Sequence, residues 1–349
     1  MPTPRFESIG VHLPTASLST AEMLAEIGDR LTVDLARVTG VRERRVYSRT
    51  ENDYEDSFAL AKKAANICLA NSRYSARDLD IVISTSITRT RDRTKFCFEP
   101  PFSLMLRNEL GAPEAAYFDI SNACAGMITG VMVLDRMIRA GVVENGLVVS
   151  GEQITPIAET AVREIVGDLD PQFAALTVGD AGAAVILDAD GGPGDLIDYV
   201  ETMTCAEYAE LCIGMPSDKS QGIAMYTDSV SMHNANRYLQ GIQWAIDYLA
   251  AQGKSFDSEG FDFVIHHQFS STAIAQIQEI SERELGLPMP RSLLTLERFG
   301  NTSSTSHFVV LHEYLRRGVI EKGAKVLLVP TASGMVFGQL SASVSLTVA

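Results

Sequence analysis

The sequence has no hydrophobic run of the roughly 18–20 residues that a membrane-spanning helix needs, and no apolar signal core near its N-terminus. Cysteine is scarce: the 349 residues include five, an odd number, with no Cys-x-x-Cys pair and no His/Cys cluster at zinc spacing. This pattern excludes a disulfide framework and a structural zinc site, and it suits a reducing compartment. We therefore expect a cytoplasmic protein without a metal ion.

Basic residues are also few. The 29 Lys and Arg residues stand against 44 Asp and Glu, which gives a net charge of −15. Such a chain repels phosphate backbones, so nucleic acid is excluded as the main partner. With 46% hydrophobic residues, the chain is long enough for two fused units that each bury a core.

The most informative stretch of the sequence surrounds Cys124. Residues 115–120 form a short apolar run of strand length, and residues 126–139 carry apolar side chains at helical spacing. Cys124 is thus predicted on a strand-to-helix turn, where unpaired N–H groups and the helix dipole favour a thiolate. Two interpretations follow from this position: a catalytic nucleophile, or a buried core cysteine, which is the usual fate of a lone Cys.

An internal repeat relates the two halves of the chain. Residues 134–146 align without a gap on residues 311–323, and both segments lead into an apolar strand. At the same offset, Asn301 takes the place of the cysteine. A duplication of this kind predicts an α/β protein with two similar halves and mostly parallel central strands, which we divide into residues 1–190 and 191–349.

A second match places a histidine in the same region. Residues 80–85 resemble residues 262–267, so that His267 ends the matching strand. Sites in open α/β sheets gather at the carboxyl ends of strands, and Cys124, His267 and Asn301 all fall at such ends. This convergence favours the nucleophile over the core cysteine.

The sequence as a whole resembles the condensing enzymes of the thiolase superfamily, in their β-ketoacyl-ACP synthase III branch. The resemblance covers nearly the whole chain and depends on the joint order and spacing of six stretches. These are Thr39-Gly-Val-Arg-Glu-Arg, Asn122-Ala-Cys-Ala-Gly, Gly179-Asp-Ala-Gly-Ala-Ala, His267-Gln268, Gly300-Asn-Thr-Ser and Ser333-Gly-Met-Val-Phe-Gly. The resemblance implies a homodimer with the thiolase fold, in which duplicated βα halves form a five-layered αβαβα arrangement.

In this family an acyl group is transferred through the cysteine in a ping-pong reaction. The resemblance implies that the Cys124 thiolate attacks a thioester and forms an acyl-enzyme. His267 and Asn301 would then stabilise the enolate of a second thioester, and the N–H groups of Cys124 and Gly334 would form the other oxyanion hole. The implied substrates are thioesters of coenzyme A or of an acyl carrier protein, and no further cofactor is expected.

The positions that recognise coenzyme A depart from the family. Ordinary synthase III enzymes hold the adenine between a Trp and an Arg, where this chain has Asp34 and Val38. Neither side chain can stack on adenine, which favours delivery by an acyl carrier protein or a different pose of coenzyme A. The cluster of Arg42, Arg44 and Arg45 is predicted either to meet an acidic carrier or to be an ordinary solvated strand face.

Glu99 is a second departure. Ordinary synthase III enzymes have a Phe just before the Pro of this loop, which reaches across the dimer interface into the partner's acyl pocket. A carboxylate buried there would have a raised pKa, suited to a general base. The arrangement resembles enzymes of bacterial long-chain olefin synthesis and related pyrone-forming synthases, in which a Glu removes a proton from the α-carbon of a second acyl chain. The segment from Cys205 to Cys212 resembles the same subgroup, and a Glu turned to solvent is the alternative.

These features predict an acyltransferase of the ketosynthase type that joins two acyl thioesters by Claisen condensation without decarboxylation. The first alternative is decarboxylative condensation with a malonyl carrier protein, which needs no Glu99. The second is acyl transfer to an alcohol or amine, and the third is a non-enzymatic scaffold in a condensing complex. An intact Cys, His and Asn set argues against the scaffold.

Several further residues are predicted to be structural. His266 would point to the face of its strand opposite His267, while His307 and His312 fall in a helix. The turn at Gly179 is assigned to architecture rather than phosphate binding.

Two other expectations concern local structure. A helix is predicted from Thr20 to about Ala36. Apolar residues on both sides of Glu99 indicate either an acyl tunnel or a dimer core: Phe96, Phe98, Phe102, Met105 and Leu106.

Overall fold

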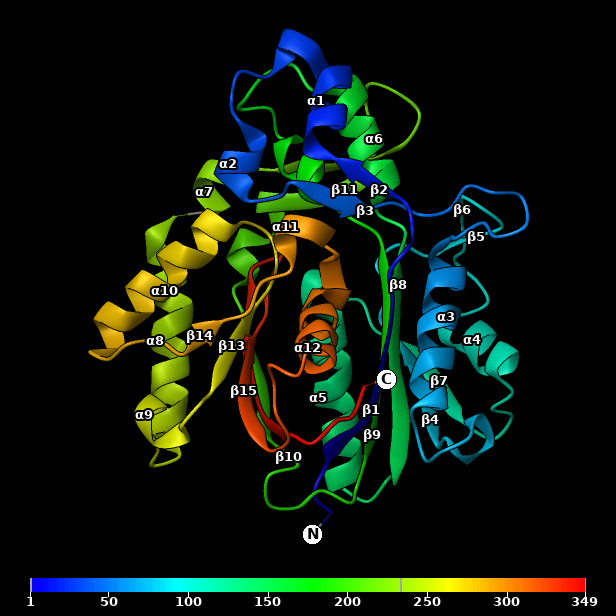
Figure 1. Ribbon diagram of the computed structural model, residues 1–349, viewed down its shortest axis with the longest axis vertical. Helices are drawn as coiled ribbons and strands as arrows, with labels where there is room; N and C mark the ends of the chain where they lie inside the picture. Colours follow the sequence, from blue (N-terminus) through cyan, green and yellow to red (C-terminus); the bar gives the residue numbers. More distant parts are fainter. Residues whose placement is uncertain (1, 233, 349) are drawn as a thin grey trace.

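Two mixed β-sheets face each other across a pair of helices in the computed structural model, which describes residues 2–232 and 234–348 (Figure 1). The strand order is β1-β9-β8-β4-β7 in the first sheet and β10-β17-β15-β13-β14 in the second. The strands are β1 (Arg5–His12), β4 (Ile81–Ser84), β7 (Ala116–Asp119), β8 (Asn145–Glu152), β9 (Ala181–Asp188), β10 (Leu196–Thr204), β13 (Phe263–His266), β14 (Arg291–Ser292), β15 (Ala324–Val329) and β17 (Val336–Val344).

The two sheets repeat one pairing pattern. β4 runs parallel to β7 and β8, and β13 runs parallel to β14 and β15. β9 and β17 run antiparallel to both of their neighbours, against the expectation of mostly parallel central strands. The sheets therefore confirm the duplication, while the division at residue 190 remains a prediction about folding units.

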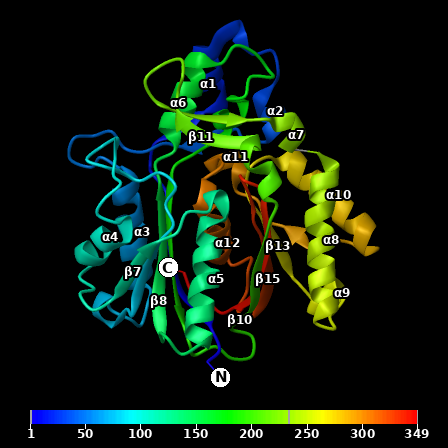
Figure 2. The same cartoon turned by 180° about the vertical axis from the view of Figure 1, so that it is seen from behind.

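Helices complete five layers, as predicted (Figures 1 and 2). The central layer holds α5 (Gly126–Arg139) and α12 (Ser306–Arg316). The outer layers hold α3 (Ser57–Ala70) and α4 (Phe102–Leu110) on the first sheet, and α8 (Ala235–Ala251), α9 (Phe256–Glu259) and α10 (Ser271–Leu285) on the second. The fold is thus the αβαβα arrangement of the thiolase fold.

α5 is buried between the two sheets, which explains its apolar sequence. Met127, Ile128 and Val131 are inaccessible to solvent, and one continuous cluster of buried side chains joins α5 and α12 to strands of both sheets. A helix with such a wide apolar surface is typical of a layer between two sheets. The helix predicted over residues 126–139 is confirmed.

A cap of short elements covers the end of the sheets from which α5 and α12 start (Figure 1). It contains α1 (Thr20–Ile27), α2 (Leu35–Thr39), α6 (Thr155–Glu164), α7 (Ser229–Met232), α11 (Leu296–Phe299), β2 (Ser17–Ser19), β3 (Glu43–Arg45), β11 (Cys212–Pro216) and β12 (Ile223–Thr227). A separate ribbon of β5 (Thr90–Arg91) and β6 (Lys95–Phe96) lies beyond the cap.

The single helix predicted from Thr20 to about Ala36 is wrong. Gly28 ends α1 with a φ of 63°, a conformation that suits glycine. Asp34 then begins α2 by accepting a hydrogen bond from the N–H of Arg37 at 3.0 Å. The residue that replaces an adenine-stacking Trp is therefore a helix cap.

The apolar residues near Glu99 do not form a tunnel within the chain. Phe102, Met105 and Leu106 are buried in a cluster with α3 and the first sheet, so they belong to the core of the chain itself. Phe98 is 79% exposed, and its ring contacts that of Phe96 at 4.9 Å.

Two features of the described residues concern a membrane-spanning helix and a metal site. No helix within residues 2–232 and 234–348 is long and apolar enough to cross a membrane. Over the same residues, no group of three or more His, Cys, Asp and Glu side chains could hold a metal ion.

Candidate active site

Cys124, His267 and Asn301 line one pocket of about 360 Å³ beneath the cap. Cys124 lies in a 3-10 turn, η3 (Ala123–Ala125), that leads directly into α5. His267 follows β13, and Asn301 follows α11. The fold thus brings together the three side chains that the sequence places at strand ends, and their catalytic roles remain predictions.

Cys124 is held on a tight turn in a desolvated position. Ala123 has a φ of 43°, which is uncommon for a residue with a side chain. Burial raises the pKa of Cys124 to about 12, although the Ser303 hydroxyl, 3.7 Å from Sγ, acts in the opposite direction. Desolvation therefore acts against the thiolate that we expected from the helix N-terminus.

The reactivity of Cys124 toward iodoacetamide should increase steeply with pH. Only the thiolate reacts, and below the pKa its fraction grows about tenfold for each pH unit. The alkylation rate of the Cys124 peptide, followed by mass spectrometry, should therefore rise about tenfold per unit from about pH 7 to pH 9. A rate that levels off below pH 8 would show that the thiol ionises more easily than its burial implies.

His267 is an uncharged imidazole with one ring nitrogen already engaged. Its Nδ1 lies 2.8 Å from the Ser306 hydroxyl, and its ring stacks near those of Phe269 and His307 at 5.7 and 5.9 Å. Burial lowers the pKa of His267 to about 3. Because a hydroxyl can donate or accept, Ser306 supports either tautomer, so Nε2 can act as a hydrogen-bond donor or as a proton acceptor.

Asn301 is fixed through both its side chain and its backbone. Its Oδ1 accepts a hydrogen bond from the N–H of Ser303 at 2.9 Å, which leaves Nδ2 as the donor. Its backbone carbonyl accepts from the N–H of Gly179 at 3.0 Å, and its own N–H donates to the Thr177 carbonyl at 2.9 Å. The Gly179 turn is thus architectural, as predicted, and it positions Asn301.

Gly179→Ala should destabilise the protein and impair condensation. A Cβ at this position would lie 2.2 Å from the Phe299 carbonyl oxygen, so the segment before Asn301 would have to move. We expect a loss of about 1–3 kcal/mol of unfolding free energy, measured by denaturant titration. Gly167→Ala is the control, because no atom lies within 4 Å of its added Cβ; equal stability of the two variants would contradict the prediction.

The turn that carries Gly334 forms one wall of the pocket. Ser333 and Met335 line it, and Gly334 has a φ of 77°. Ala332, from the short strand β16 (Thr331–Ala332), packs against Cys124. The N–H of Gly334 as an oxyanion donor remains a prediction.

The sequence analysis did not assign a role to three residues that line the pocket or contact its side chains. Ser303, the last residue of Gly300-Asn-Thr-Ser, donates its N–H to Asn301, and the Ser306 hydroxyl lies beside His267; serines two and five residues after the candidate Asn were a usable signal for positioning groups. Cys212 lines the pocket, and its sulfur accepts a hydrogen bond from the Thr227 hydroxyl at 3.4 Å. Nothing in the sequence near Cys212 indicates that it faces Cys124.

The ungapped repeat alignment is wrong at the site itself. α12 has 11 residues and α5 has 14, so the alignment shifts between the helix ends and the turns before them. In the structure Ala123 corresponds to Ser303, since the two share a positive φ of 43° and 55°. Cys124 therefore corresponds to Ser304, not to Asn301. Cys124 and Asn301 line the same pocket without being equivalent positions of the repeat.

The prediction that Arg42, Arg44 and Arg45 form a surface cluster is also wrong. Arg44 is 2% exposed, and its guanidinium donates to the Thr20 hydroxyl at 3.1 Å and the Leu176 carbonyl at 3.0 Å. Burial lowers its pKa to about 10. Arg42 stays at the surface, where it pairs with Glu297.

Glu99 does not reach the pocket of its own chain. It is exposed in the loop between β6 and α4, and it is absent from the residues that surround Cys124. A role at a cysteine would therefore require a second subunit.

Division of the candidate groups between two halves of a duplicated α/β fold is typical of condensing enzymes with the thiolase fold. Residues 118–203 match the 3-oxoacyl-(acyl-carrier-protein) synthase III family, and residues 252–343 match the C-terminal part of the same family. The two matches together span slightly more than half of the chain. This protein belongs to the 3-oxoacyl-(acyl-carrier-protein) synthase III family.

Individual relatives agree with this assignment. The chain is 26% identical over 330 residues to the beta-ketoacyl-(acyl-carrier-protein) synthase III of Yersinia enterocolitica, covering 94% of this chain and 96% of the relative. The Clostridium beijerinckii enzyme of the same name is 26% identical over 341 residues, with coverage of 95% and 97%.

Solved structures of OleA from Xanthomonas campestris share the fold. The cerulenin-bound protein has a TM-score of 0.81 at 21% identity, covering 98% of this chain and 97% of that one. A variant crystallised with lauric acid and lauroyl-CoA has a TM-score of 0.80 at 21% identity, with coverage of 98% and 99%.

Proposed function

We propose that this condensing enzyme joins two acyl thioesters by a non-decarboxylative Claisen condensation through an acyl group on Cys124. The convergence of Cys124, His267 and Asn301 in one pocket carries the proposal. Val38 and Thr272 both line the pocket, and a hydrogen bond of 2.7 Å from the Thr272 hydroxyl to the Val38 carbonyl joins them.

The first half-reaction loads the cysteine. His267 Nε2 takes the thiol proton, and the Cys124 sulfur attacks the carbonyl carbon of the first thioester. The N–H groups of Cys124 and Gly334 hold the oxyanion. The C–S bond to the carrier then breaks, and the carrier thiolate leaves with the proton from His267.

The second half-reaction forms the carbon–carbon bond. His267 now takes the tautomer with its proton on Nε2, while Nδ1 accepts from the Ser306 hydroxyl. His267 Nε2 and Asn301 Nδ2 donate hydrogen bonds to the carbonyl oxygen of the second thioester, while a carboxylate removes a proton from its α-carbon. The carbanion attacks the acyl-Cys124 carbonyl, and the Cys124 thiolate leaves. The product is a β-ketoacyl thioester on the second carrier.

Glu99 of the partner subunit is the proposed base for that α-proton. The loop that carries it is exposed beside β7, the edge strand of the first sheet. Tyr117 on β7 is 40% exposed and Phe98 is 79% exposed, which supports an apolar contact between two copies at this edge. In such a homodimer each loop faces the other subunit.

The carrier is proposed to be an acyl carrier protein or coenzyme A. The relatives from Yersinia and Clostridium are named beta-ketoacyl-(acyl-carrier-protein) synthases III, and one OleA variant was crystallised with lauroyl-CoA. A second candidate function, decarboxylative condensation with a malonyl carrier protein, is favoured by the names of those curated relatives.

The test incubates wild-type protein with matched acyl-CoA and acyl carrier protein thioesters. Intact mass reports the acyl-enzyme, and mass spectrometry of the small molecules reports the β-keto product. Formation of both from unactivated acyl thioesters supports the proposal. Failure of every thioester to add mass to the protein would overturn it.

A further inference from the structure

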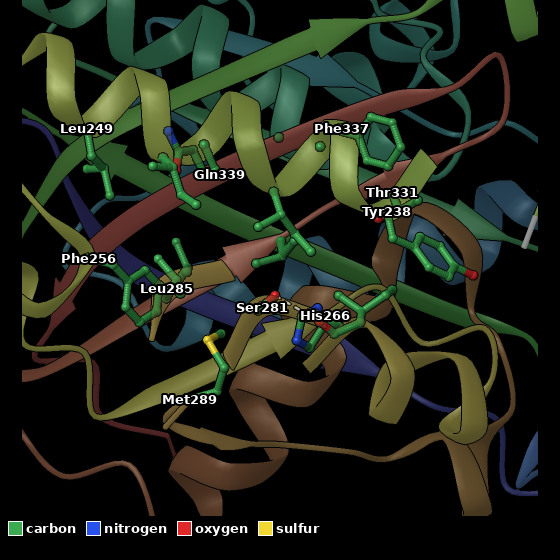
Figure 3. A pocket seen from close by; sticks show the side chains of 18 of the residues that line it. Tyr238, Leu249, Phe256, His266, Ser281, Leu285, Met289, Thr331, Phe337 and Gln339 are labelled. Carbon is green, nitrogen blue, oxygen red and sulfur yellow. Dashed lines mark hydrogen bonds between the residues drawn. The ribbon is translucent and has the colours of Figure 1, made fainter. Parts of the chain in front are cut away.

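A second cavity of about 80 Å³ adjoins the candidate active site on the far side of the second sheet (Figure 3). It lies between that sheet and the helices α8 and α10. Tyr238 and Thr331 line both cavities, so the two are neighbours. The face of β13 opposite His267 opens into it.

The cavity has a floor of strands and apolar walls. His266 on β13 pairs with Val329 on β15, and Gln339 comes from β17 on the other side of β15. The walls are formed mainly by Ile242, Ile246, Leu249, Phe256, Ile277 and Leu285. No charged side chain of the described residues lines this cavity.

Two polar side chains of the floor have an unused hydrogen-bonding atom. His266 and Gln339 are each 3% exposed, and neither His266 Nε2 nor Gln339 Nε2 has a partner among the described residues. The nearby Ser281 hydroxyl is already used, because it donates to the Ile277 carbonyl at 2.8 Å. Buried polar atoms without partners are uncommon and costly, so two of them on residues that line one cavity indicate a ligand that pairs with them.

We propose that this cavity holds an acyl chain that carries a neutral oxygen substituent, a hydroxyl or a keto group, bound by His266 or Gln339. A plain hydrocarbon chain would leave both atoms unpaired, and a charged group would find no counter-charge. A hydroxyl or keto oxygen accepts from the Gln339 amide, and a hydroxyl also donates to His266. The inference deepens the proposed function, on which it rests.

The electrostatics of His266 agree with a neutral ligand. Burial lowers the pKa of His266 to about 4, so the imidazole is uncharged at neutral pH. His307, the other titratable group that affects it, is likewise buried and neutral, with its pKa lowered to about 4. His266 therefore offers a hydrogen bond rather than a charge.

The test measures binding without catalysis. Cys124→Ala protein is titrated calorimetrically with dodecanoic acid and with a positional series of hydroxy- and oxododecanoic acids. At least one oxygenated acid should bind about tenfold more tightly than the plain acid, as one additional hydrogen bond implies. Adding Gln339→Leu or His266→Phe should reduce that preference to about twofold or less, whereas Leu327→Met, a change of similar volume on the strand floor of the same cavity, should preserve it.

Thermal stability gives a second measurement. Gln339→Leu replaces an unpaired amide with an apolar group of similar size, so the Tm should stay equal or rise. A Tm lowered by several degrees in both polar-to-apolar variants would show that ordered water already satisfies these atoms, and would overturn the inference.

The two proposals fail in different ways. Equal binding of plain and oxygenated acids, together with normal acylation of wild-type protein by plain thioesters, overturns the inference and leaves the proposed function intact. An oxygen preference in Cys124→Ala protein supports the cavity assignment even where wild-type protein accepts no thioester, which overturns the proposed function alone.

Discussion

Cys124→Ala is expected to abolish acyl loading and, with it, every condensed product. The sulfur is the atom to which the acyl group is bound, so its removal leaves no acyl-enzyme to condense. We expect product formation to fall by about 10⁴-fold or more. Intact mass after incubation with an acyl thioester should show the acyl adduct in wild-type protein and none in the variant.

Cys212→Ala is the matched control for this experiment. Cys212 lines the same pocket, so it is the other thiol that a thioester could reach. The Cys212→Ala protein should gain the same mass as wild type. An adduct that persists in Cys124→Ala and disappears in Cys212→Ala would show that Cys212, and not Cys124, is the nucleophile.

Glu99→Gln should separate the two half-reactions. Loading of Cys124 needs no base on this loop, so the acyl-enzyme should form at the wild-type rate. Condensation of two unactivated acyl thioesters should fall by about 10²–10⁴-fold, which is the usual contribution of a positioned base. If the variant condenses as well as wild type when malonyl carrier protein is supplied, the decarboxylative function is the correct one.

Mixed dimers give the direct test of a shared site. Cys124→Ala and Glu99→Gln subunits are inactive in different ways, and unfolding and refolding them together produces heterodimers. If Glu99 acts on the partner's cysteine, each heterodimer contains one complete site, and a random mixture should regain about a quarter of wild-type activity. A mixture as inactive as its parents would show that Glu99 acts within its own chain or not at all.

The local structure around Cys124 could be predicted because strand, turn and helix follow one another there with strong periodicity. The repeat predicted two similar halves, and the resemblance to the thiolase superfamily implied the five layers. The start of the second central helix could not be placed, since α12 lacks three residues that α5 has. Because α12 is shorter, the ungapped alignment of the two halves holds at the C-terminal ends of the helices and is shifted by three residues at their N-terminal ends.

Burial was the property that the sequence predicted least well. Arg44 lies in a basic run and so indicates a solvated strand, yet it bridges Thr20 and Leu176 in the interior. The position of Cys124 at a helix N-terminus predicts a thiolate, but the low polarity of its surroundings raises the pKa of the thiol. The burial of Arg44 and the raised pKa of Cys124 depend on atoms from segments far away in the chain. A local sequence pattern carries no information about those segments.

The burial of most of α5 between the two sheets also constrains how this chain can fold. All five strands of the first sheet come from residues 5–188, so they can assemble before the second half has been synthesised. Until α12 and the second sheet dock, the apolar side chains with which α5 packs against them remain in water. The repeat gives the protein two halves, but the shared apolar layer makes them mutually dependent. A nascent first half is therefore an aggregation-prone intermediate with an exposed hydrophobic surface. The second half covers that surface when it docks.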